Sequence, residues 1–196
     1  MRTITYGGAI SLDGYLTAGD GAIDWLHFSK DVSAVMAEYW KNVDTILAGR
    51  KTWEFMAGHE APAETKSKKP AKKPAKRKQP AMRTYVFSRT LKAIERPGVE
   101  LVSTDAAQFV RDLKRQPGRE ICLMGGGELA QTLLAAGLVD FVRLNVHPIL
   151  LGAGAPAFRD PGHRVKLKLT ECREIDGGCV LVSYDVVNDR ASRRKE

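Results

Sequence analysis

The sequence predicts an α/β domain built on one mostly parallel sheet, and three observations support this prediction. Short β-type runs alternate with helical runs, several β-type runs are continuously apolar, and the last two are separated by an Asp-Gly pair. Alternation indicates parallel strands joined by helices, apolar runs indicate central strands covered on both faces, and Asp-Gly favours a hairpin. We expect about eight strands with an antiparallel C-terminal hairpin and helices on both faces of the sheet.

The expected strands differ in their patterns. Residues 121–124 read Ile-Cys-Leu-Met, which is typical of a central strand, whereas residues 165–169 alternate between apolar side chains and lysine, as in a half-exposed strand. The expected strands are residues 3–9, 45–48, 84–87, 100–102, 120–124, 141–146, 165–170 and 179–186.

Three helices have recognisable ends. Ser29 is a good N-cap for a helix with apolar residues at positions 32, 35, 36 and 39, and Asp105 with Gln108 resembles a capping box. The helix after Asp105 stops at a Pro-Gly pair. Residues 128–136 form the third helix, which closes at Gly137, because glycine is favoured just beyond a helix end.

Length and composition indicate one domain. The chain has 196 residues, of which 43% are hydrophobic, enough for one substantial core. We expect a single domain over residues 1–187, interrupted by a loop at 61–80, and a flexible basic tail at 188–196. The three cysteines are odd in number and lack metal-ligand spacing, which argues against a disulfide framework and a metal site.

Hydropathy argues against a membrane location. The mean hydropathy is −0.27, and no run approaches the ~20 apolar residues that a membrane-spanning helix needs. The N-terminal residues go directly into strand-like sequence without the basic and apolar regions of a signal peptide. We therefore expect a cytoplasmic protein.

The net charge of +8 is concentrated in one segment. Residues 66–78 hold eight of the 31 basic residues and no acid, so the remaining 23 balance the 23 acids. The surrounding segment, residues 61–80, is rich in Lys, Pro and Ala, which cannot bury a core, and we expect a disordered surface loop. The alternative is that residues 66–78 bind nucleic acid or an acidic partner.

Three turns at expected strand ends carry residues suited to binding an anion. The first is Gly125-Gly126-Gly127-Glu128, between the strand at 120–124 and the helix at 128–136. A helix N-terminus presents unpaired N–H groups, and glycines let a diphosphate approach the backbone closely. A tight strand-to-helix turn without a ligand is the alternative.

The other two turns combine hydroxyl and cationic side chains. Gly49, Arg50 and Thr52 follow the second expected strand, while Ser88 and Arg89 follow the third. A guanidinium beside a hydroxyl suits a phosphate monoester such as the 2′-phosphate of NADP. Each turn could also be a capped turn with solvated charges.

The ordered set of motifs resembles a known family. Gly-Arg-Lys-Thr-Trp-Glu at 49–54, followed by Phe-Ser-Arg-Thr at 87–90, is similar to the cofactor-binding pattern of dihydrofolate reductases. The segments SLDGY at 11–15, GGG at 125–127, GLVD at 137–140 and PILLGAG at 148–154 resemble the reductase domain of the riboflavin-biosynthesis deaminase-reductases, the RibD C-terminal family. The resemblance covers residues 1–187, except the basic loop.

This resemblance implies a dihydrofolate-reductase-like fold, NADPH as hydride donor and a homodimer formed around the C-terminal strands. It also assigns roles to particular residues. The diphosphate would be held by Gly49, Arg50, Thr52, Gly125, Gly126, Gly127 and Glu128. The 2′-phosphate would be held by Ser88 and Arg89, and the nicotinamide would be bordered by Ala9, Leu12, Asp13 and Gly14. Leu151 and Gly152 would belong to a substrate-side loop, for which a glycine-rich connection between strands is the alternative.

Hydride transfer needs alignment of donor and acceptor and a proton for the neighbouring heteroatom. Asp31 is a candidate proton donor, although a first-turn carboxylate is also favoured by the helix dipole alone. Trp25 and Phe28 could form an aromatic wall for a flat heterocycle or simply pack in the core, and His147 is expected in the core.

The sequence therefore predicts an NADPH-dependent reductase of a small pteridine-like or pyrimidine-like heterocycle. The activity would be of the dihydrofolate reductase or 5-amino-6-(5-phosphoribosylamino)uracil reductase type. The chain lacks the His-x-Glu and Pro-Cys-x-x-Cys pattern of a zinc deaminase, so the reductase would stand alone.

Overall fold

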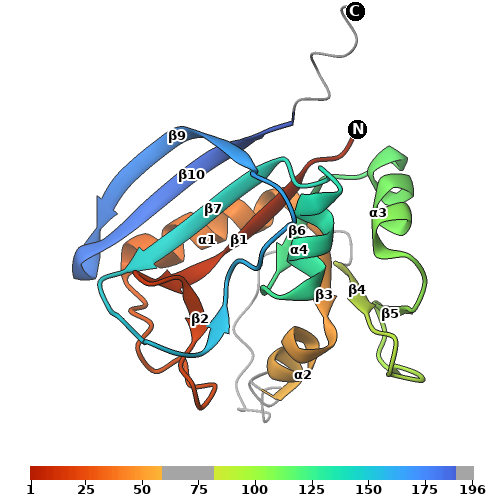
Figure 1. Ribbon diagram of the computed structural model, residues 1–196, viewed down its shortest axis with the longest axis horizontal. Coiled ribbons are helices and arrows are strands. Elements are labelled where there is room, and N and C mark those ends of the chain that lie inside the picture. The colour runs from red at the N-terminus through yellow and green to blue at the C-terminus, as the bar shows by residue number, and fades with distance from the viewer. Residues whose placement is uncertain (59–81, 189–196) are drawn as a thin grey trace, which may run out of the picture.

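The structure is a computed structural model that describes residues 1–58 and 82–188. Eight strands form one sheet in the order β5-β4-β3-β6-β1-β7-β10-β9 (Figure 1). The strands of this sheet are β1 (Ile4–Ser11), β3 (Val43–Gly49), β4 (Arg83–Phe87), β5 (Val99–Val102), β6 (Glu120–Met124), β7 (Phe141–His147), β9 (Lys166–Ile175) and β10 (Cys179–Val187). The loop expected at 61–80, its basic part at 66–78 and the tail from residue 189 onward lie outside the described residues.

The strand directions confirm the predicted sheet. The strands from β5 to β7 run parallel, and β10 runs antiparallel to both β7 and β9. β9 and β10 are joined by the expected tight turn, in which Gly177 and Gly178 adopt positive φ angles of 81° and 68°. β9 is longer than the expected 165–170, because pairing with β10 extends it through a polar sequence to Ile175.

Two short strands were not predicted. β2 (Tyr15–Thr17) and β8 (Ala155–Pro156) pair antiparallel beside the main sheet. With three and two residues, they are too short for a hydrophobic period to develop. They join the loop after β1 to the segment before β9, which brings two distant parts of the chain together.

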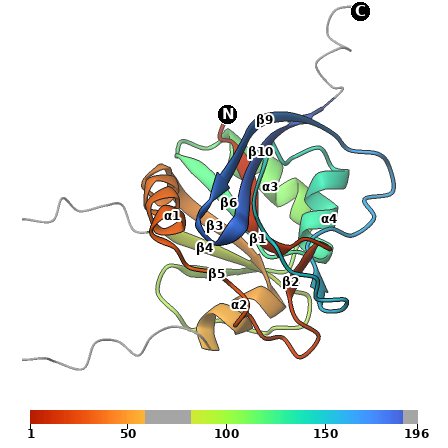
Figure 2. The same cartoon turned by 90° about the vertical axis from the view of Figure 1, so that its left-hand side faces the viewer.

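Four helices cover the sheet, namely α1 (Lys30–Asn42), α2 (Arg50–Gly58), α3 (Ala106–Arg115) and α4 (Glu128–Ala135). Figure 2 shows α1 on one face and α3 with α4 on the other, as predicted. The Ser29 hydroxyl accepts a hydrogen bond from the Val32 N–H at 3.2 Å, and the Asp105 carboxylate accepts one from the Gln108 N–H at 2.6 Å. The Gln108 side chain bonds Asp112 instead of returning to Asp105, so only half of a capping box forms.

The C-terminus of α4 confirms the role expected for Gly137. Gly137 has a φ of +62°, and its N–H donates to the Leu134 carbonyl while the Leu138 N–H donates to the Leu133 carbonyl. This pair of bonds satisfies carbonyl groups at the helix end that would otherwise lack partners.

The main hydrophobic core lies between the sheet and the α3–α4 layer. It contains the fully buried strand residues Ile4, Leu47, Ile121, Leu123 and Val142, together with Val110, Leu113 and Leu133 of the helices. The α1 face instead holds two separate smaller clusters, one around Val32 and one around Ile46. The α1 face is therefore less completely filled than the opposite face.

Charged groups are buried near the N-terminal ends of the parallel strands. The Arg2 guanidinium bonds Asp44 and the Thr45 hydroxyl, and the Lys114 ammonium bonds Asp140 and the Leu138 carbonyl. Within the described ranges, no helix is long and apolar enough to cross a membrane.

Candidate cofactor and substrate site

The three predicted anion-binding turns follow three neighbouring strands. β4, β3 and β6 are adjacent, and the register pairs Phe87 with Gly49 and Ala48 with Met124. Gly125, the residue after Met124, therefore lies directly beside Gly49. Ser88 follows Phe87, the residue that pairs with Gly49. The turns meet at the C-terminal edge of the parallel strands, which is where open α/β sheets bind their ligands.

Two glycines of the turn after β6 pack against the protein itself. A Cβ atom on Gly125, whose φ is +74°, would lie 2.1 Å from the Thr52 hydroxyl oxygen. A Cβ atom on Gly126 would lie 2.5 Å from the Pro156 carbonyl oxygen and 2.9 Å from that of Ala157. The alternative interpretation of this segment, a tight strand-to-helix turn without a ligand, thus accounts for these two glycines. The same packing places the Thr52 hydroxyl against the turn.

Two parts of this edge remain open to a ligand. Gly127 is the N-cap of α4 and supplies no side chain to the first-turn N–H groups of that helix. A Cβ atom on Gly49 would meet nothing within 4 Å among the described residues. Backbone donors and open space therefore lie side by side, which is the arrangement a diphosphate requires.

The cationic side chains near these turns are exposed. Arg89 is 85% exposed and lies 3.6 Å from the Glu128 carboxylate, which links the end of β4 to the start of α4. Arg50 lies 3.8 Å from Glu54. Ion pairs between such exposed groups contribute only ~0–1 kcal/mol, so an anionic ligand could displace either partner.

The Ser88 hydroxyl is already used within its own turn. It accepts hydrogen bonds from the N–H groups of Thr90 at 3.2 Å and Leu91 at 3.0 Å. The Ser88 and Thr90 hydroxyls also share a hydrogen bond at 3.3 Å, in which either can be the donor. Ser88 therefore caps this turn, and the two hydroxyls lie together at the end of β4.

Asp13 connects the loop after β1 to the loop after β7. Its carboxylate accepts hydrogen bonds from the Ser11 hydroxyl at 2.6 Å, the Leu151 N–H at 3.1 Å and the Gly152 N–H at 2.7 Å. The bond from Ser11, with those from the two backbone groups, lowers the pKa of Asp13. The expected nicotinamide loop, which also includes the exposed Leu12 and the partly buried Gly14, is thereby tied to the expected substrate loop.

His147, at the end of β7, is only 2% exposed. Its Nε2 atom accepts a hydrogen bond from the His27 N–H at 3.1 Å, and its Nδ1 atom lies 3.3 Å from the Asn145 carbonyl oxygen. These contacts fit a neutral ring protonated at Nδ1, and burial lowers the pKa of His147. The Trp25 ring packs edge-on against this ring, with 5.2 Å between the ring centroids.

The remaining candidate residues for the substrate and nicotinamide sites differ in burial and do not form one continuous surface. Trp25 is partly buried against His147, whereas Phe28 is 69% exposed and forms no continuous wall with it. Asp31 is exposed in the first turn of α1, where a carboxylate interacts favourably with the helix dipole. Ala9 lies on β1 directly beside Asn145 of β7, a residue that the sequence did not single out.

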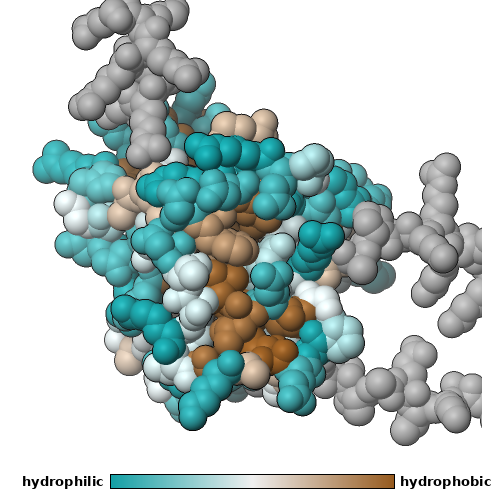
Figure 3. Space-filling view, turned by 90° about the vertical axis from the view of Figure 1, so that its right-hand side faces the viewer, coloured by the Kyte–Doolittle hydropathy of each residue, from teal (hydrophilic) through white to brown (hydrophobic). Residues whose placement is uncertain are grey.

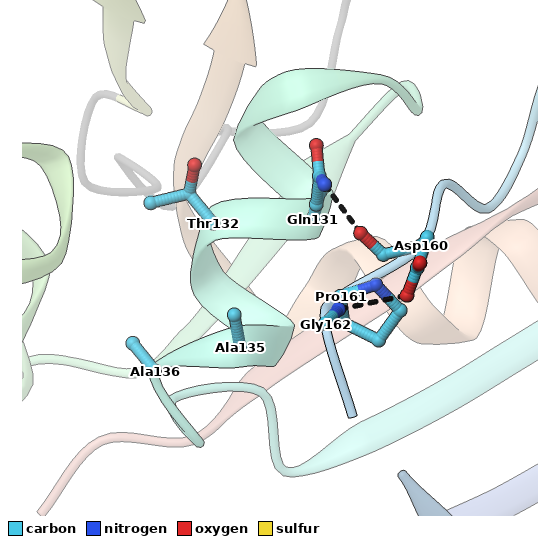
Figure 4. A pocket seen from close by; sticks show the side chains of 7 residues that line it. All are labelled: Gln131, Thr132, Ala135, Ala136, Asp160, Pro161 and Gly162. Atoms are coloured by element: carbon cyan, nitrogen blue, oxygen red, sulfur yellow. Dashed lines mark hydrogen bonds between the residues drawn. The ribbon is translucent and has the colours of Figure 1, made fainter. Parts of the chain in front are cut away.

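An open depression lies along the body of α4, away from its N-terminus (Figure 4). It has a volume of about 770 Å³ and is lined by Gln131, Thr132, Ala135, Ala136, Asp160, Pro161 and Gly162. The Gln131 side chain donates to the Asp160 carbonyl, and the Gly162 N–H donates to the Asp160 carboxylate at 2.8 Å. The Gln131 bond holds the segment after β8 against α4, and the Gly162 bond forms a turn within that segment. Apolar side chains gather elsewhere, on the side of the molecule where β5 and α3 lie and toward the end that carries α2 (Figure 3).

The sheet order, the antiparallel C-terminal hairpin and the ligand-accessible strand ends define an α/β protein with the dihydrofolate-reductase-like fold. The chain belongs to the RibD C-terminal domain family, whose model matches residues 2–181. It is 33% identical over 185 residues to the uncharacterized protein YyaP of Bacillus subtilis strain 168, which covers 94% of this chain and 95% of that protein.

Solved structures share the fold. A putative riboflavin biosynthesis protein from Shewanella sp. PV-4 has a TM-score of 0.77 at 23% identity, covering 96% of this chain and 100% of that one. A deaminase/5-amino-6-(5-phosphoribosylamino)uracil reductase from Thermotoga maritima has a TM-score of 0.67 at 18% identity, covering 95% and 57%. Dihydrofolate reductase from Enterococcus faecalis, complexed with NADP(H), has a TM-score of 0.61 at 13% identity, covering 95% and 97%. The predicted fold and family are confirmed.

Proposed function

We propose that the protein is an NADPH-dependent reductase that transfers a hydride to a small pteridine-like or pyrimidine-like heterocycle. The observation that carries this proposal is the meeting of three turns at one sheet edge, with open space over Gly49 beside the uncapped start of α4. Membership of the RibD C-terminal family supports it. So does the fold shared with a reductase complexed with NADP(H) and with a named uracil reductase.

The residues at the edge fit a dinucleotide phosphate. The backbone at Gly49, the first turn of α4 and the side chains of Arg50 and Thr52 would hold the diphosphate, and Ser88 with Arg89 would hold the 2′-phosphate. Ala9 and the loop over Leu12 to Gly14 would border the nicotinamide. When bound, NADPH supplies the hydride from its nicotinamide C4 atom.

The chain itself contributes binding and orientation. Asp13 has a lowered pKa and stays ionised near neutral pH, so its role is to hold two loops together rather than to donate a proton. The His147 ring is neutral and both of its nitrogen atoms are engaged, so it positions Trp25 rather than acting as an acid. The catalytic proton donor is not assigned: Asp31 is a candidate, and the alternatives are a helix-dipole role for Asp31 and solvent as the proton source.

A thermal-shift measurement with NADPH, NADH and no ligand tests the cofactor. NADPH at 100 times its dissociation constant adds ~2.7 kcal/mol of stability, and we expect a smaller gain with NADH. No shift with either nucleotide would reject the proposal. Dihydrofolate, other pterins and aminopyrimidines then form the substrate panel for NADPH oxidation.

The basic segment at 66–78 provides an internal control. Deleting it is expected to leave NADPH oxidation unchanged, because none of the described site residues belongs to it. Salt-dependent nucleic-acid binding that disappears in the same deletion, with no nucleotide binding in the intact chain, would support the alternative function instead.

We also propose that the protein is a homodimer that pairs through β9. This edge strand exposes Leu167 by 42% and Leu169 by 52%. Its first half carries Lys166 and Lys168, and its second half carries Glu171, Arg173 and Glu174. Antiparallel pairing of β9 with a second copy would bring the lysines of one copy near the glutamates of the other and flank the leucines with side chains of the second copy.

A further inference from the structure

The C-terminal edge of the parallel strands changes charge along its length. The segments after β1 and β7, residues 12–28 and 148–157, hold every predicted substrate residue and contain no lysine or arginine. These two segments are the substrate-side loops. Only β6 separates β1 from β3, a span of about 10 Å from strand to strand. On the proposed cofactor side, the turns after β3 and β4 carry four exposed cations, namely Arg50, Lys51, Arg89 and Lys92.

The substrate-side loops carry carboxylates instead of cations. Asp13, Asp20 and Asp24 of the first loop are all exposed, and the second loop holds no charged residue. Asp176, in the turn between β9 and β10, adds a fourth carboxylate 3.6 Å from the His27 ring of the first loop. With histidine neutral, the substrate-side loops are therefore formally negative.

The next cations along the chain do not offset these carboxylates. Lys30, which follows the first loop, is exposed and is followed directly by Asp31. Arg159, which follows the second loop, lies toward the cofactor side, because a Cβ atom on Gly127 would be 4.0 Å from its Nε atom. The substrate-side loops thus keep their negative charge.

Two arginines of the neighbouring strands already have acidic partners. Arg143 of β7 lies 3.4 Å from Glu120, and Arg173 of β9 lies 3.6 Å from Glu171. The Arg143 guanidinium also lies 5.1 Å from the ring centroid of Phe141, the first residue of β7. Arg143 is therefore directed toward the end of β7 opposite to the substrate-side loop.

The backbone donors of the second loop are already bound to a carboxylate. Asp13 accepts hydrogen bonds from the Leu151 N–H at 3.1 Å and the Gly152 N–H at 2.7 Å. The hydrogen bond from Ser11, together with these two, lowers the pKa of Asp13, which is therefore ionised near neutral pH. Successive backbone N–H groups are a common phosphate-binding device. Here Asp13 takes the place that such an anion would occupy.

The substrate-side loops also expose large apolar side chains. Leu12 is 66% exposed and Leu150 is 70% exposed. The Leu12 N–H donates to the Ile149 carbonyl at 2.9 Å, so the two leucines lie on segments that are bonded to each other. Neighbouring exposed apolar residues on a loop fixed by hydrogen bonds favour contact with an apolar part of a ligand.

We propose that the substrate is an unphosphorylated heterocycle with an apolar substituent that contacts Leu12 and Leu150, and that the acidic substrate-side loops exclude phosphorylated analogues. This inference rests on the proposed function, which places the heterocycle at these loops. A phosphate monoester carries nearly two negative charges and is bound by cationic side chains or free N–H groups. The loops supply neither, and like charges that face each other disfavour binding. Phosphoribosyl compounds are thus outside the substrate class.

Calorimetric titrations of the NADP⁺-loaded protein with three uracils test this selection. The probes are 6-(methylamino)uracil, 6-(butylamino)uracil and the butyl compound with a terminal phosphate. We expect the butyl compound to bind at least about fivefold more tightly than the methyl compound, because it buries three more methylene groups. The phosphorylated compound should bind at least about tenfold more weakly than the butyl compound.

A series of 6-alkylpterins with the same three substituents is titrated in parallel and covers the second ring class. The inference is overturned if neither butyl compound binds, or if the phosphorylated compound of the series that binds is held as tightly as its butyl counterpart. Neither comparison needs a variant of the protein.

Ionic strength distinguishes repulsion from a steric block. The Debye length falls from about 30 Å at 0.01 M salt to about 3 Å at 1 M salt. Discrimination against the phosphorylated compound should therefore shrink over this range, while the preference for butyl over methyl persists. Discrimination that does not depend on salt would contradict the role of the carboxylates.

Variants at exposed positions provide matched controls. Asp24→Lys should strengthen binding of the phosphorylated compound at least about fivefold, whereas Asp112→Lys, the same change of charge on α3, should not. Leu150→Ser should remove the preference for butyl over methyl, whereas Met82→Ser, also at an exposed residue, should retain it. Unchanged selectivity in both Asp24→Lys and Leu150→Ser rejects the assignment.

Cofactor binding separates this inference from the proposed function. A thermal shift with NADPH is expected in the wild-type protein and in all four variants. If NADPH causes no shift in the wild-type protein, the proposed function fails. If the shift occurs but the phosphorylated compound binds as well as the butyl compound, the cofactor site stands and only the substrate class is rejected.

Discussion

The Oδ2 atom of Asp13 lies 2.7 Å from the backbone nitrogen of Gly152, although 139 residues separate them in the chain. The bond ties together the loops that follow β1 and β7, two adjacent parallel strands. In the proposed function, one loop borders the nicotinamide and the other borders the substrate. Asp13 therefore sets the relative position of the two reactants.

Replacing Asp13 with Asn should loosen this connection, because a carboxamide has one acceptor oxygen for the two backbone N–H groups. We expect faster hydrogen exchange at Leu151 and Gly152 and a lower kcat/KM with little change in NADPH affinity. Asp20→Asn is the control, because within the described ranges Asp20 accepts a hydrogen bond only from the Ala22 N–H in its own turn. Unchanged exchange at both amides would contradict this role.

The wild-type connection also has a defined pH dependence. The pKa of Asp13 in the folded protein lies below its ordinary value of 3.8, so the ionised carboxylate stabilises the fold above that value. This contribution is lost only as the pH falls through the lowered pKa. Protection of the two amides should therefore persist from neutral pH down to mildly acidic conditions.

Gly49→Ala tests whether a ligand uses the space over this turn. The added methyl group meets no atom of residues 1–58 or 82–188 within 4 Å, so the thermal midpoint of the free protein should not fall. If the diphosphate lies there, NADPH binding should weaken by at least about tenfold, because close backbone approach is blocked. Gly58→Ala, at the end of α2, also adds a methyl group that has no neighbour within 4 Å in the part of the chain that the structure describes, and it should leave NADPH binding intact.

Arg89→Ala tests the 2′-phosphate assignment. Loss of a hydrogen bond to a charged phosphate costs ~1.5–3 kcal/mol, so NADPH binding should weaken about 10-fold to 100-fold while NADH binding changes little. Arg115→Ala removes an exposed, ion-paired arginine of α3 and serves as the control. Equal losses for both nucleotides in a binding titration would reject the assignment.

The lowered pKa of His147 predicts that the protein loses stability in acid. Burial lowers its pKa below the ordinary 6.5, so the unfolded chain binds more protons than the folded protein between the two values. The free energy of unfolding should therefore decline as the pH falls below 6.5. His147→Asn, which keeps a neutral side chain, should flatten this decline in urea titrations, whereas replacing the exposed His163 with Asn should not.

Leu169→Glu tests the proposed dimer. A charge in the middle of the paired edge should shift the protein from dimer to monomer in light scattering. Met82→Glu, at an exposed residue just before β4, should leave the dimer intact. A monomeric wild-type protein would reject the pairing.

Local signals in the sequence were sufficient for most of the fold. Ser29 and Asp105 cap helices as predicted, and Gly137 ends α4, because each of these effects depends on residues within one helical turn. The parallel strands were visible as apolar runs. β2 and β8 were missed because their pairing depends on a partner about 140 residues away. The final length of β9 was missed because it depends on pairing with β10 rather than on a hydrophobic pattern.

The candidate site likewise has features that the sequence predicts and contacts that only the tertiary structure shows. The sequence by itself determined the family, the sheet and the glycine turns, since backbone conformation, caps and hydrophobic periods are set by near neighbours. Only the tertiary structure decided that Gly125 packs on Thr52, that Asp13 joins two loops and that Asn145 Oδ1 is buried without a hydrogen-bond partner among the described residues. These contacts depend on which strands lie side by side, and that order is fixed by packing the whole core rather than by any local segment.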